Sequence, residues 1–374
     1  MASLRICRRC VMDSSVPNLR FDADGHCNYC TDMLARSRDR LVATPEQRER
    51  QLQAFVAKIK EAGRGKRYDC AVGISGGVDS SYVLHRVFEL GLRPIGVHMD
   101  NGWNSELAQH NIEQLVKRCG VDLHTHVIDW GEYRKLMQAF FDADVVDVEL
   151  LYDNAALAVN MRAAAQHGVR YILTGVNQAT EGMKMPPGWN WFKRDRRNIL
   201  AIWRRFGQGG RLESFPAIGT AQFLYYTLAR NIEWVSFLDY LEYDKPAVLE
   251  LLQERYGYKP YPYKHYESVF TRFYQGYILL RKFGVDKRKL HFGSLVVSGQ
   301  MSRDEALADL EKPPYPSEEA LRQDIAYFLK KMGWTEQQLE AYLARPGKPH
   351  ALYGTEKPIN DIVVPISRRI LRRA

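Results

Sequence analysis

The sequence predicts an α/β fold with a parallel sheet, preceded by a small cysteine-containing module and followed by a mostly helical C-terminal region. Three observations lead to this prediction. Short apolar segments alternate with helical segments between residues 69 and 174. Two C-x-x-C pairs lie near the start of the chain. From about residue 186 the alternation ends, and the sequence becomes rich in Tyr, Trp and Arg. Strand–helix alternation is typical of a parallel sheet covered on both faces.

Length and charge set the outer limits of the prediction. The 374 residues are enough for two or three domains. We expect a cysteine module at 1–43, an α/β domain at 44–205 and a helical region at 206–374. The net charge of +9 favours anionic ligands, although the dense basic run at 368–373 is also typical of a solvated chain end. No apolar run approaches a membrane span and no signal peptide is visible, so we expect a cytoplasmic protein.

The two C-x-x-C pairs predict a metal site. Cys7 and Cys10 are separated by 16 residues from Cys27 and Cys30. Two such knuckles supply the four thiolates of a tetrahedral Zn²⁺ site. Disulfides are the weaker explanation in a cytosolic chain. Four thiolates leave no open coordination position, so the expected zinc is structural rather than catalytic.

The remaining elements follow in order. Thr44 caps a helix that starts at Pro45 and runs to about Gly63, with Gln47 completing a capping box. Apolar segments then predict strands at 69–74, 93–99, 122–129 and 169–174. Helical spacing predicts helices at 79–90, 104–119, 130–141 and 152–167. Because ligands of parallel sheets bind at the carboxyl ends of strands, those ends are the first places to look for a site.

The segment after the first strand reads as a phosphate-binding loop. It contains Ser75, Gly76, Gly77, Asp79 and Ser80, in the pattern S-G-G-x-D-S. The glycines allow the backbone to approach an anion, and the following helix adds free N–H groups and a positive dipole end. The two hydroxyls can donate hydrogen bonds. The carboxylate makes sense only beside a Mg²⁺ ion that the phosphates of ATP share. An ordinary glycine turn with a helix cap is the weaker alternative, because a strand precedes the segment and a helix follows it.

The end of the fourth strand is the second candidate. Thr174 and Gly175 place a hydroxyl and a backbone amide beside the loop, and Asn177 offers amide contacts. Glu181 is a carboxylate that we expect to face Asp79, so that the two share Mg²⁺. The alternative for Glu181 is a helix cap.

Asp100 ends the second strand and has two interpretations. It could bind the ribose hydroxyls of the nucleotide, or it could form the turn that ends the strand.

Together these motifs resemble a known family. The S-G-G-x-D-S loop resembles the PP-loop of the ATP pyrophosphatase superfamily, whose fold is of the adenine nucleotide alpha hydrolase-like type. Over nearly the whole chain the motifs are similar to those of the N-acetyl sugar amidotransferase family of lipopolysaccharide and O-antigen biosynthesis. The motifs are R-I-C-x-x-C-V-M-D at 5–13, C-N-Y-C at 27–30, the loop at 75–80, D-N-G-W at 100–103, T-G-x-N-x-x-T-E-G at 174–182, W-x-W-x-K-x-D at 189–195, H-Y-E-S at 265–268, D-K-R-K at 286–289 and S-G-Q at 298–300.

The resemblance implies an activity, a ligase-type amidotransferase reaction that forms AMP and pyrophosphate from ATP. The enzyme would adenylate the acetamido oxygen of a nucleotide-linked N-acetyl sugar and replace it with ammonia, giving an acetamidino group. Ammonia would come through a channel from partner subunits resembling the glutaminase and cyclase halves of imidazole glycerol phosphate synthase. The chain itself shows no glutaminase signature. A closed site is expected, because water competes with ammonia.

Several later residues are candidates for contacts with this substrate. Lys193 is the candidate for stabilising negative charge on phosphate or on the adenylated amide. Trp189 and Trp191 could flank the sugar or simply pack in a core, and Asp195 belongs to the same motif.

Lys287 and Arg288 belong to a charged run at 286–289. They could contact the diphosphate of the substrate, or they could lie in a solvated loop.

Other activities remain open at this stage. Amidation of a sugar uronic carboxylate needs the same chemistry. Some tRNA-thiolating enzymes also pair a zinc module with a PP-loop, but Cys70 and Cys119 are isolated in this sequence, and no second zinc module appears late in the chain. We therefore expect no nucleic-acid partner. A non-catalytic nucleotide-binding scaffold is disfavoured because Ser75, Asp79 and Glu181 are all present.

Overall fold

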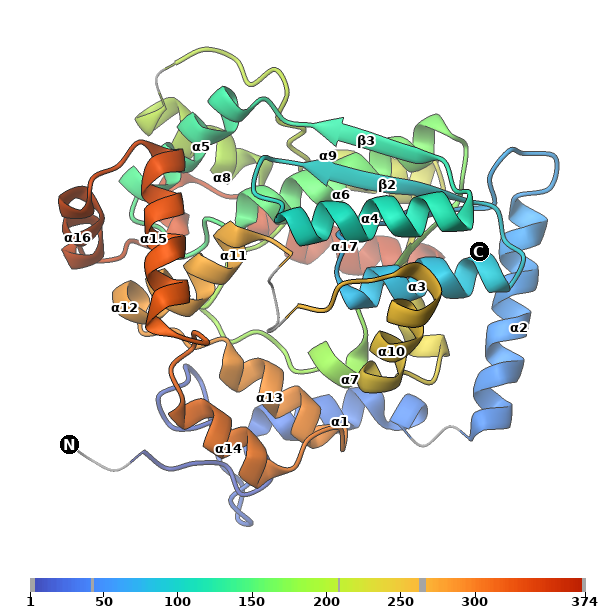
Figure 1. Ribbon diagram of the computed structural model, residues 1–374, viewed down its shortest axis with the longest axis horizontal. Coiled ribbons are helices and arrows are strands. Elements are labelled where there is room, and N and C mark those ends of the chain that lie inside the picture. The colour runs from blue at the N-terminus through green and yellow to red at the C-terminus, as the bar shows by residue number, and fades with distance from the viewer. Residues whose placement is uncertain (1–3, 42–43, 208, 262–266, 372–374) are drawn as a thin grey trace.

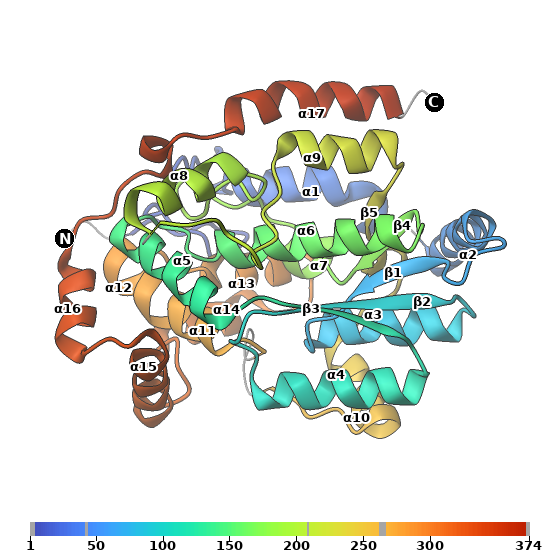
Figure 2. The ribbon, with the colours of Figure 1, turned by 90° about the horizontal axis from the view of Figure 1, so that it is seen from above.

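A five-stranded parallel sheet forms the centre of the molecule. The computed structural model describes residues 4–41, 44–207, 209–261 and 267–371. The strand order is β3-β2-β1-β4-β5 (Figure 2). The strands are β1 (Cys70–Gly73), β2 (Pro94–Asp100), β3 (Leu123–Val127), β4 (Tyr171–Thr174) and β5 (Glu233–Ser236). The first four confirm the predicted strands, and all four strand pairs are parallel.

Helices cover both faces of the sheet, as predicted. α6 (Leu150–Gln166) packs on one face and α3 (Val78–Glu89) on the other (Figure 2). Successive residues of β1 divide between two cores: Ala71 packs on the α6 side, whereas Cys70 and Val72 pack on the α3 side. A strand that is apolar on both faces is what the continuous apolar run in the sequence predicts.

The predicted helices of the α/β region are confirmed, with ends that differ by one or two residues. They are α2 (Pro45–Ala62), α3, α4 (Glu106–Cys119), α5 (Trp130–Asp142) and α6. The capping box of α2 forms as expected, since Thr44 Oγ1 accepts from Gln47 N and the Gln47 side chain accepts from Thr44 N.

No strand was predicted at the position of β5. This strand has only four residues, lies at the sheet edge and is half-buried, so neither an apolar run nor a strict alternation marks it. Its pairing with β4 begins at Tyr171 and Glu233, and Arg170 donates to Glu233 beside it. The sheet therefore continues beyond residue 205.

Two helices, α7 (Gln178–Glu181) and α8 (Arg196–Phe206), follow β4. The rest of the C-terminal region is mostly helical, as predicted. Its elements are α9 (Thr220–Leu224), η1 (Tyr225–Ala229), η2 (Phe237–Tyr240), α10 (Lys245–Tyr256), α11 (Val269–Phe273), η3 (Tyr274–Ile278), α12 (Leu279–Phe283), α13 (Arg288–Val297), α14 (Arg303–Glu311), α15 (Glu318–Met332), α16 (Glu336–Ala344), η4 (His350–Tyr353) and α17 (Lys357–Leu371). Within the described part of the chain, no helix combines the length and the apolar character needed to cross a membrane.

The N-terminal cysteine module is fastened to this helical region. Its helix α1 (Asn28–Leu41) packs beside α13, and Figure 1 shows α1, α13 and α14 grouped together. Lys289 Nζ donates to Asp13 over 2.6 Å, and Arg303 donates to the carbonyl oxygens of Cys7 and Cys10. The N-terminal module and the C-terminal helical region thus stabilise each other.

Candidate active site

The loop at 75–80 joins the carboxyl end of β1 to α3. Gly76 has a φ of +83°, and a Cβ there would lie 2.8 Å from the carbonyl oxygen of Ala108, so only glycine fits. Gly77 is the N-cap of α3 and has no side chain to cap it. The positive end of the α3 dipole therefore lies at this loop.

Two hydroxyls hold the loop in this shape. Ser80 Oγ accepts from Ser75 N over 3.3 Å and donates to the Gly77 carbonyl over 3.1 Å. Ser75 Oγ accepts from Gly77 N over 3.3 Å and lies 3.1 Å from Ser80 Oγ. Both hydroxyls thus lie within the loop and stabilise its shape; their role as phosphate donors stays a prediction.

The end of β4 lies against the loop. A Cβ on Gly175 would be 2.8 Å from Cβ of Asp79 and 2.9 Å from Ser80 N, so the two strand ends meet closely. Thr174 Oγ1 donates to a carbonyl of β5 over 3.1 Å, which uses the hydroxyl within the sheet. Asn177 Oδ1 caps α7, and its Nδ2 donates to the Gly175 carbonyl. These two side chains shape the loop that carries Glu181.

The negative charges of Asp79 and Glu181 both affect the pKa of one tyrosine, Tyr243. Asp79 accepts a hydrogen bond from the Tyr243 hydroxyl. Burial and the charge of Asp79 raise the pKa of Tyr243, with Glu181 adding to the effect. The helix cap of α7 is Asn177, so the capping interpretation of Glu181 is wrong. Two carboxylates beside this loop are a donor set that would fit Mg²⁺.

Two further tyrosines, which sequence reasoning missed, cover the loop from the C-terminal side. Tyr258 and Tyr261 each donate from the hydroxyl to the Gly76 carbonyl over 3.0 Å. Burial raises the pKa of both, so both remain protonated donors near neutral pH. Together they fix the peptide plane between Gly76 and Gly77. The only signal in the sequence is the Tyr-rich composition after residue 186.

A third carboxylate, Glu267, borders the loop. Its Cδ lies 3.8 Å from the position of a Cβ on Gly77, and its carbonyl accepts from Ser105 N over 2.9 Å. Burial raises the pKa of Tyr258 and of Tyr152, and the charge of Glu267 adds to the rise in both. Glu267 belongs to the H-Y-E-S motif, whose first two residues, His265 and Tyr266, lie outside the described residues.

Asp100 forms a turn at the end of β2. Its Oδ1 accepts from Gly102 N over 2.8 Å and from Asn104 Nδ2 over 3.4 Å. This geometry favours the strand-ending interpretation over a ribose contact, because the carboxylate is already engaged by the turn.

Lys193 lies between two carboxylates at the start of α6. Its Nζ is 2.7 Å from Asp147 and 2.8 Å from Asp153. The Lys193 side chain is 30% exposed, that of Asp147 2% and that of Asp153 43%. Burial acts to lower the pKa of Lys193, but the two carboxylates outweigh it and raise that pKa. Lys193 therefore stays protonated, and the two neighbouring carboxylates carry more negative charge than its single positive charge.

The tryptophan motif mainly builds the wall around Lys193. Trp189 is buried in the main core, which favours the packing interpretation. Trp191 stacks on His350 with ring centroids 5.1 Å apart and donates from Nε1 to Asp195. Asp195 is fully buried and caps α8. Asp195 thus positions Trp191 and is itself shielded from solvent.

The basic run at 286–289 is not a solvated loop, because each of its cations has a partner within the chain. Lys287 donates to Glu149 over 2.7 Å, and Gln275 donates to the same carboxylate. Arg288 binds Asp286 and the carbonyl of Lys312 at the end of α14. Lys287 lies next to the Lys193 group, since its charge helps to lower the pKa of Asp147.

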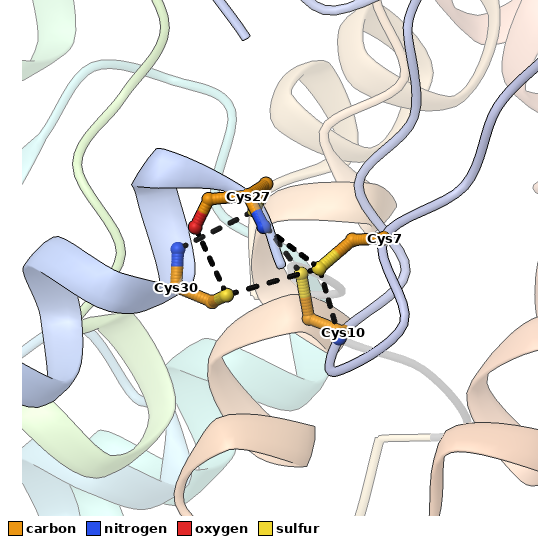
Figure 3. Close-up of side chains that lie close together, drawn as sticks. All are labelled: Cys7, Cys10, Cys27 and Cys30. Atoms are coloured by element: carbon orange, nitrogen blue, oxygen red, sulfur yellow. Dashed lines mark hydrogen bonds between the residues drawn. The ribbon is translucent and has the colours of Figure 1, made fainter. Parts of the chain in front are cut away.

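The four predicted cysteines form a buried cluster (Figure 3). The Sγ atoms of Cys7 and Cys30 are 3.8 Å apart, and those of Cys10 and Cys27 are 3.6 Å apart. Tetrahedral Zn²⁺ with Zn–S distances of about 2.3 Å needs sulfurs about 3.8 Å apart. Cys27 N donates to Cys7 Sγ over 3.1 Å, as expected for a thiolate acceptor. The cluster fits a single tetrahedral ion; a four-iron cluster would hold its cysteine sulfurs farther apart, because each binds a different iron.

The C-terminal region matches a family involved in lipopolysaccharide synthesis. Residues 267–365 match the family described as "LPS biosynthesis protein WbpG-like, C-terminal domain". These residues form a WbpG-like C-terminal domain. The match supports the predicted resemblance for this region, and the matched segment begins at Glu267, whose side chain lies close to Gly77 of the loop. No curated protein matches the chain.

Solved structures of three other proteins resemble the chain at low scores. A predicted subunit of a tRNA methyltransferase from Methanocaldococcus jannaschii has 16% identity and a TM-score of 0.28, covering 50% of this chain and 75% of that one. An NH3-dependent NAD synthetase from Campylobacter jejuni has 14% identity and a TM-score of 0.28, covering 58% and 99%. The U34-tRNA thiolase NcsA from Methanococcus maripaludis has 13% identity and a TM-score of 0.31, covering 90% of both chains. At these scores the likeness is no evidence for a shared activity.

The parallel sheet, the glycine-containing loop between β1 and α3, and the match of residues 267–365 to the WbpG-like domain are the observations from which a function is proposed.

Proposed function

We propose that the protein is an ATP-dependent amidotransferase that converts the acetamido group of a nucleotide-linked N-acetyl sugar into an acetamidino group. The observation that carries the proposal is the position of Glu267. This first residue of the WbpG-like domain has its carboxylate beside Gly77 of the nucleotide loop. A sugar held by that domain would therefore meet ATP at the PP-loop.

The first step is adenylation of the substrate. The acetamido oxygen attacks the α-phosphorus of ATP, and pyrophosphate leaves. The backbone of the loop and the hydroxyls of Ser75 and Ser80 would hold the phosphates. Asp79 and Glu181 would hold Mg²⁺, which supplies charge neutralisation of the phosphate oxygens when it is bound. The hydrogen bond that Tyr243 donates to Asp79 would hold this carboxylate in a fixed orientation.

In the second step ammonia attacks the imidate carbon, and AMP leaves with the former amide oxygen. One proton must be removed from the attacking nitrogen. Asp153 is suited to accept it, because burial and the charge of Asp147 outweigh Lys193 and raise the pKa of Asp153, while its side chain stays partly exposed. Lys193 would hold Asp153 in place and face the departing phosphate. Trp191, Lys287 and Arg288 are proposed to shape the sugar and diphosphate side of the site.

Ammonia would come from separate glutaminase and cyclase-like subunits. If this chain itself released ammonia from glutamine, it would need a reactive cysteine. All six of its cysteines are buried. Burial also raises the pKa of Cys70 and Cys119, which keeps them as unreactive thiols. The same fact argues against the alternative of a tRNA-thiolating enzyme that uses a catalytic cysteine. Amidation of a uronic carboxylate remains the second candidate, because it needs the same adenylation.

We propose Zn²⁺ as the ion in the four-cysteine site. Its position supports a structural role: the module packs on α13 through Lys289 and holds no exposed coordination position.

Assays with ammonium salts test the proposed function. The protein is incubated with ATP, Mg²⁺, a nucleotide-linked N-acetyl sugar and ammonium at elevated pH, where free ammonia is available. We expect AMP, pyrophosphate and a product in which NH replaces one O by mass. Glutamine should replace ammonium only when a glutaminase partner is added. Unmodified sugars together with amidated uronic substrates would select the second candidate, and thiolated tRNA in a sulfur-supplied assay would select the RNA-modifying enzyme.

A further inference from the structure

His98 is a buried histidine beside the nucleotide loop, and the proposed reaction gives it no role. It lies in β2 and is 8% exposed. Its Nδ1 lies 2.9 Å from the carbonyl oxygen of Ile74, and its Nε2 lies 3.1 Å from Nδ2 of Asn104. Because a carbonyl oxygen accepts and an amide nitrogen donates, the ring proton belongs on Nδ1 and Nε2 is the acceptor. The ring thus joins the end of β1 to the turn that follows β2.

The carbonyl that accepts from His98 lies at the entrance of the nucleotide loop. The regular pairing of β1 with β2 ends at Gly73 and Val97, and Ile74 N then donates to the Val97 carbonyl over 2.8 Å. The carbonyl of Ile74 lies beyond this pairing and accepts from the His98 ring. It belongs to the peptide unit that leads into Ser75, the first residue of the loop. His98 therefore holds the peptide plane through which the chain enters the loop.

The turn that carries Asn104 is held by the WbpG-like domain. Asn104 forms an isolated antiparallel bridge with Ser268, and backbone hydrogen bonds of 2.9 and 3.1 Å flank this bridge. A second link comes from α15, where Lys331 donates to the Gly102 carbonyl. The hydrogen bond at one ring nitrogen of a histidine decides which nitrogen carries the proton. By fixing Asn104, that domain keeps the histidine in the tautomer that can donate to Ile74.

We propose that His98 is a positioning residue that fixes the nucleotide loop for the binding of ATP. The proposal rests on the proposed function, in which the loop backbone and two serine hydroxyls hold the phosphates. Backbone donors are effective only when their geometry is fixed before the ligand arrives. Without the bond to the Ile74 carbonyl, the start of the loop would lose its anchor on β2, and a buried acceptor would be left without its donor.

Binding of a non-hydrolysable ATP analogue tests the proposal on the full chain. Titration calorimetry with α,β-methylene ATP and Mg²⁺ gives a dissociation constant without turnover. In His98→Gln the amide corresponds in position to Nε2 and no longer donates to Ile74, so the dissociation constant should rise about tenfold or more. In His98→Asn an amide N–H takes the position of Nδ1, so the constant should stay within about threefold of the wild type. His98→Met, which has no donor, should behave like His98→Gln and replaces it if that variant does not fold.

The matched control is His85→Gln. His85 is also buried, at 1% exposed, and its Nδ1 lies 2.7 Å from the hydroxyl of Tyr256, but it lies in the middle of α3. Its replacement should lower the melting temperature at least as much as His98→Gln does, whereas the dissociation constant should equal that of the wild type. Melting followed by circular dichroism separates a loss of stability from a loss of binding.

Four outcomes would overturn the proposal. His98→Gln that binds the analogue like the wild type would remove the positioning role. Equal weakening in His98→Gln and His85→Gln would make the effect one of general stability. Equal weakening in His98→Gln and His98→Asn would show that the bond to Ile74 is not the cause. A wild type that does not bind the analogue would overturn the proposed function as well, so the failure of the inference alone can be distinguished from the failure of both.

Discussion

Replacement of Lys193 by methionine should destabilise the protein in a pH-dependent way. Lys193→Met keeps the length of the side chain but leaves Asp147, which is 2% exposed, without its nearest cation. Breaking a buried ion pair costs about 3–5 kcal/mol. We expect about 3 kcal/mol, at the lower end of that range, because the Lys193 ammonium is itself partly exposed.

The direction of the pH dependence follows from the pKa of Asp147. Burial alone would raise this pKa, but Lys193, Lys287 and His350 outweigh it and lower the pKa below its ordinary value. In the wild type, Asp147 therefore stabilises the fold above about pH 4, and this contribution is lost as pH falls further. Without Lys193, the effect of burial on Asp147 is opposed by fewer positive charges, so the pKa of Asp147 should rise. The variant should then lose stability as pH increases, so its deficit is largest near neutral pH.

Urea unfolding followed by fluorescence measures this effect. The deficit of Lys193→Met relative to the wild type should be about 3 kcal/mol at about pH 7.5 and about half of that at about pH 5. The control is Lys184→Met, which breaks an exposed pair with Asp32 and should cost less than about 1 kcal/mol at either pH. Equal deficits in the two variants, or a deficit of Lys193→Met that does not change with pH, would refute the argument.

Three more predictions concern the nucleotide loop and the metal site. In Gly175→Ala, the new Cβ would press on the backbone of α3 near Asp79, so the variant should be less stable by about 1–3 kcal/mol and should bind ATP more weakly, as measured by calorimetry. The control Gly77→Ala meets no contact under 3.4 Å and should leave stability unchanged. Asp79→Asn should lower AMP formation about a hundredfold or more with an unchanged melting temperature, and a smaller effect would exclude a role with Mg²⁺. Cys10→Ser should lose the bound ion and unfold at lower temperature; metal analysis of the wild type should give about one zinc per chain, and a visible iron–sulfur absorption band would contradict zinc.

The sequence predicted the parts of the site that lie in short, local motifs. The loop at 75–80 needs its glycines for backbone approach, and the four cysteines need their spacing for one ion, so both patterns are readable without a structure. Parallel order of the strands then brought the ends of β1 and β4 together, because alternating strands and helices allow few arrangements.

Most of the features that could not be predicted from the sequence depend on contacts between residues far apart in the chain. Tyr258 reaches the Gly76 carbonyl across 182 positions, and Lys193 finds Asp147 across 46. No local spacing encodes such pairs. β5 was missed because an edge strand of four half-buried residues has neither a periodic pattern nor a continuous apolar run.

Product analysis of the complete reaction tests the central claim most directly. With ATP, ammonium and a nucleotide-linked N-acetyl sugar, chromatography and mass spectrometry should find AMP, pyrophosphate and an amidine in equal amounts, and Asp79→Asn should abolish all three together. Formation of ADP and phosphate, or cleavage of ATP to AMP while every tested N-acetyl sugar nucleotide stays unmodified, would contradict the account.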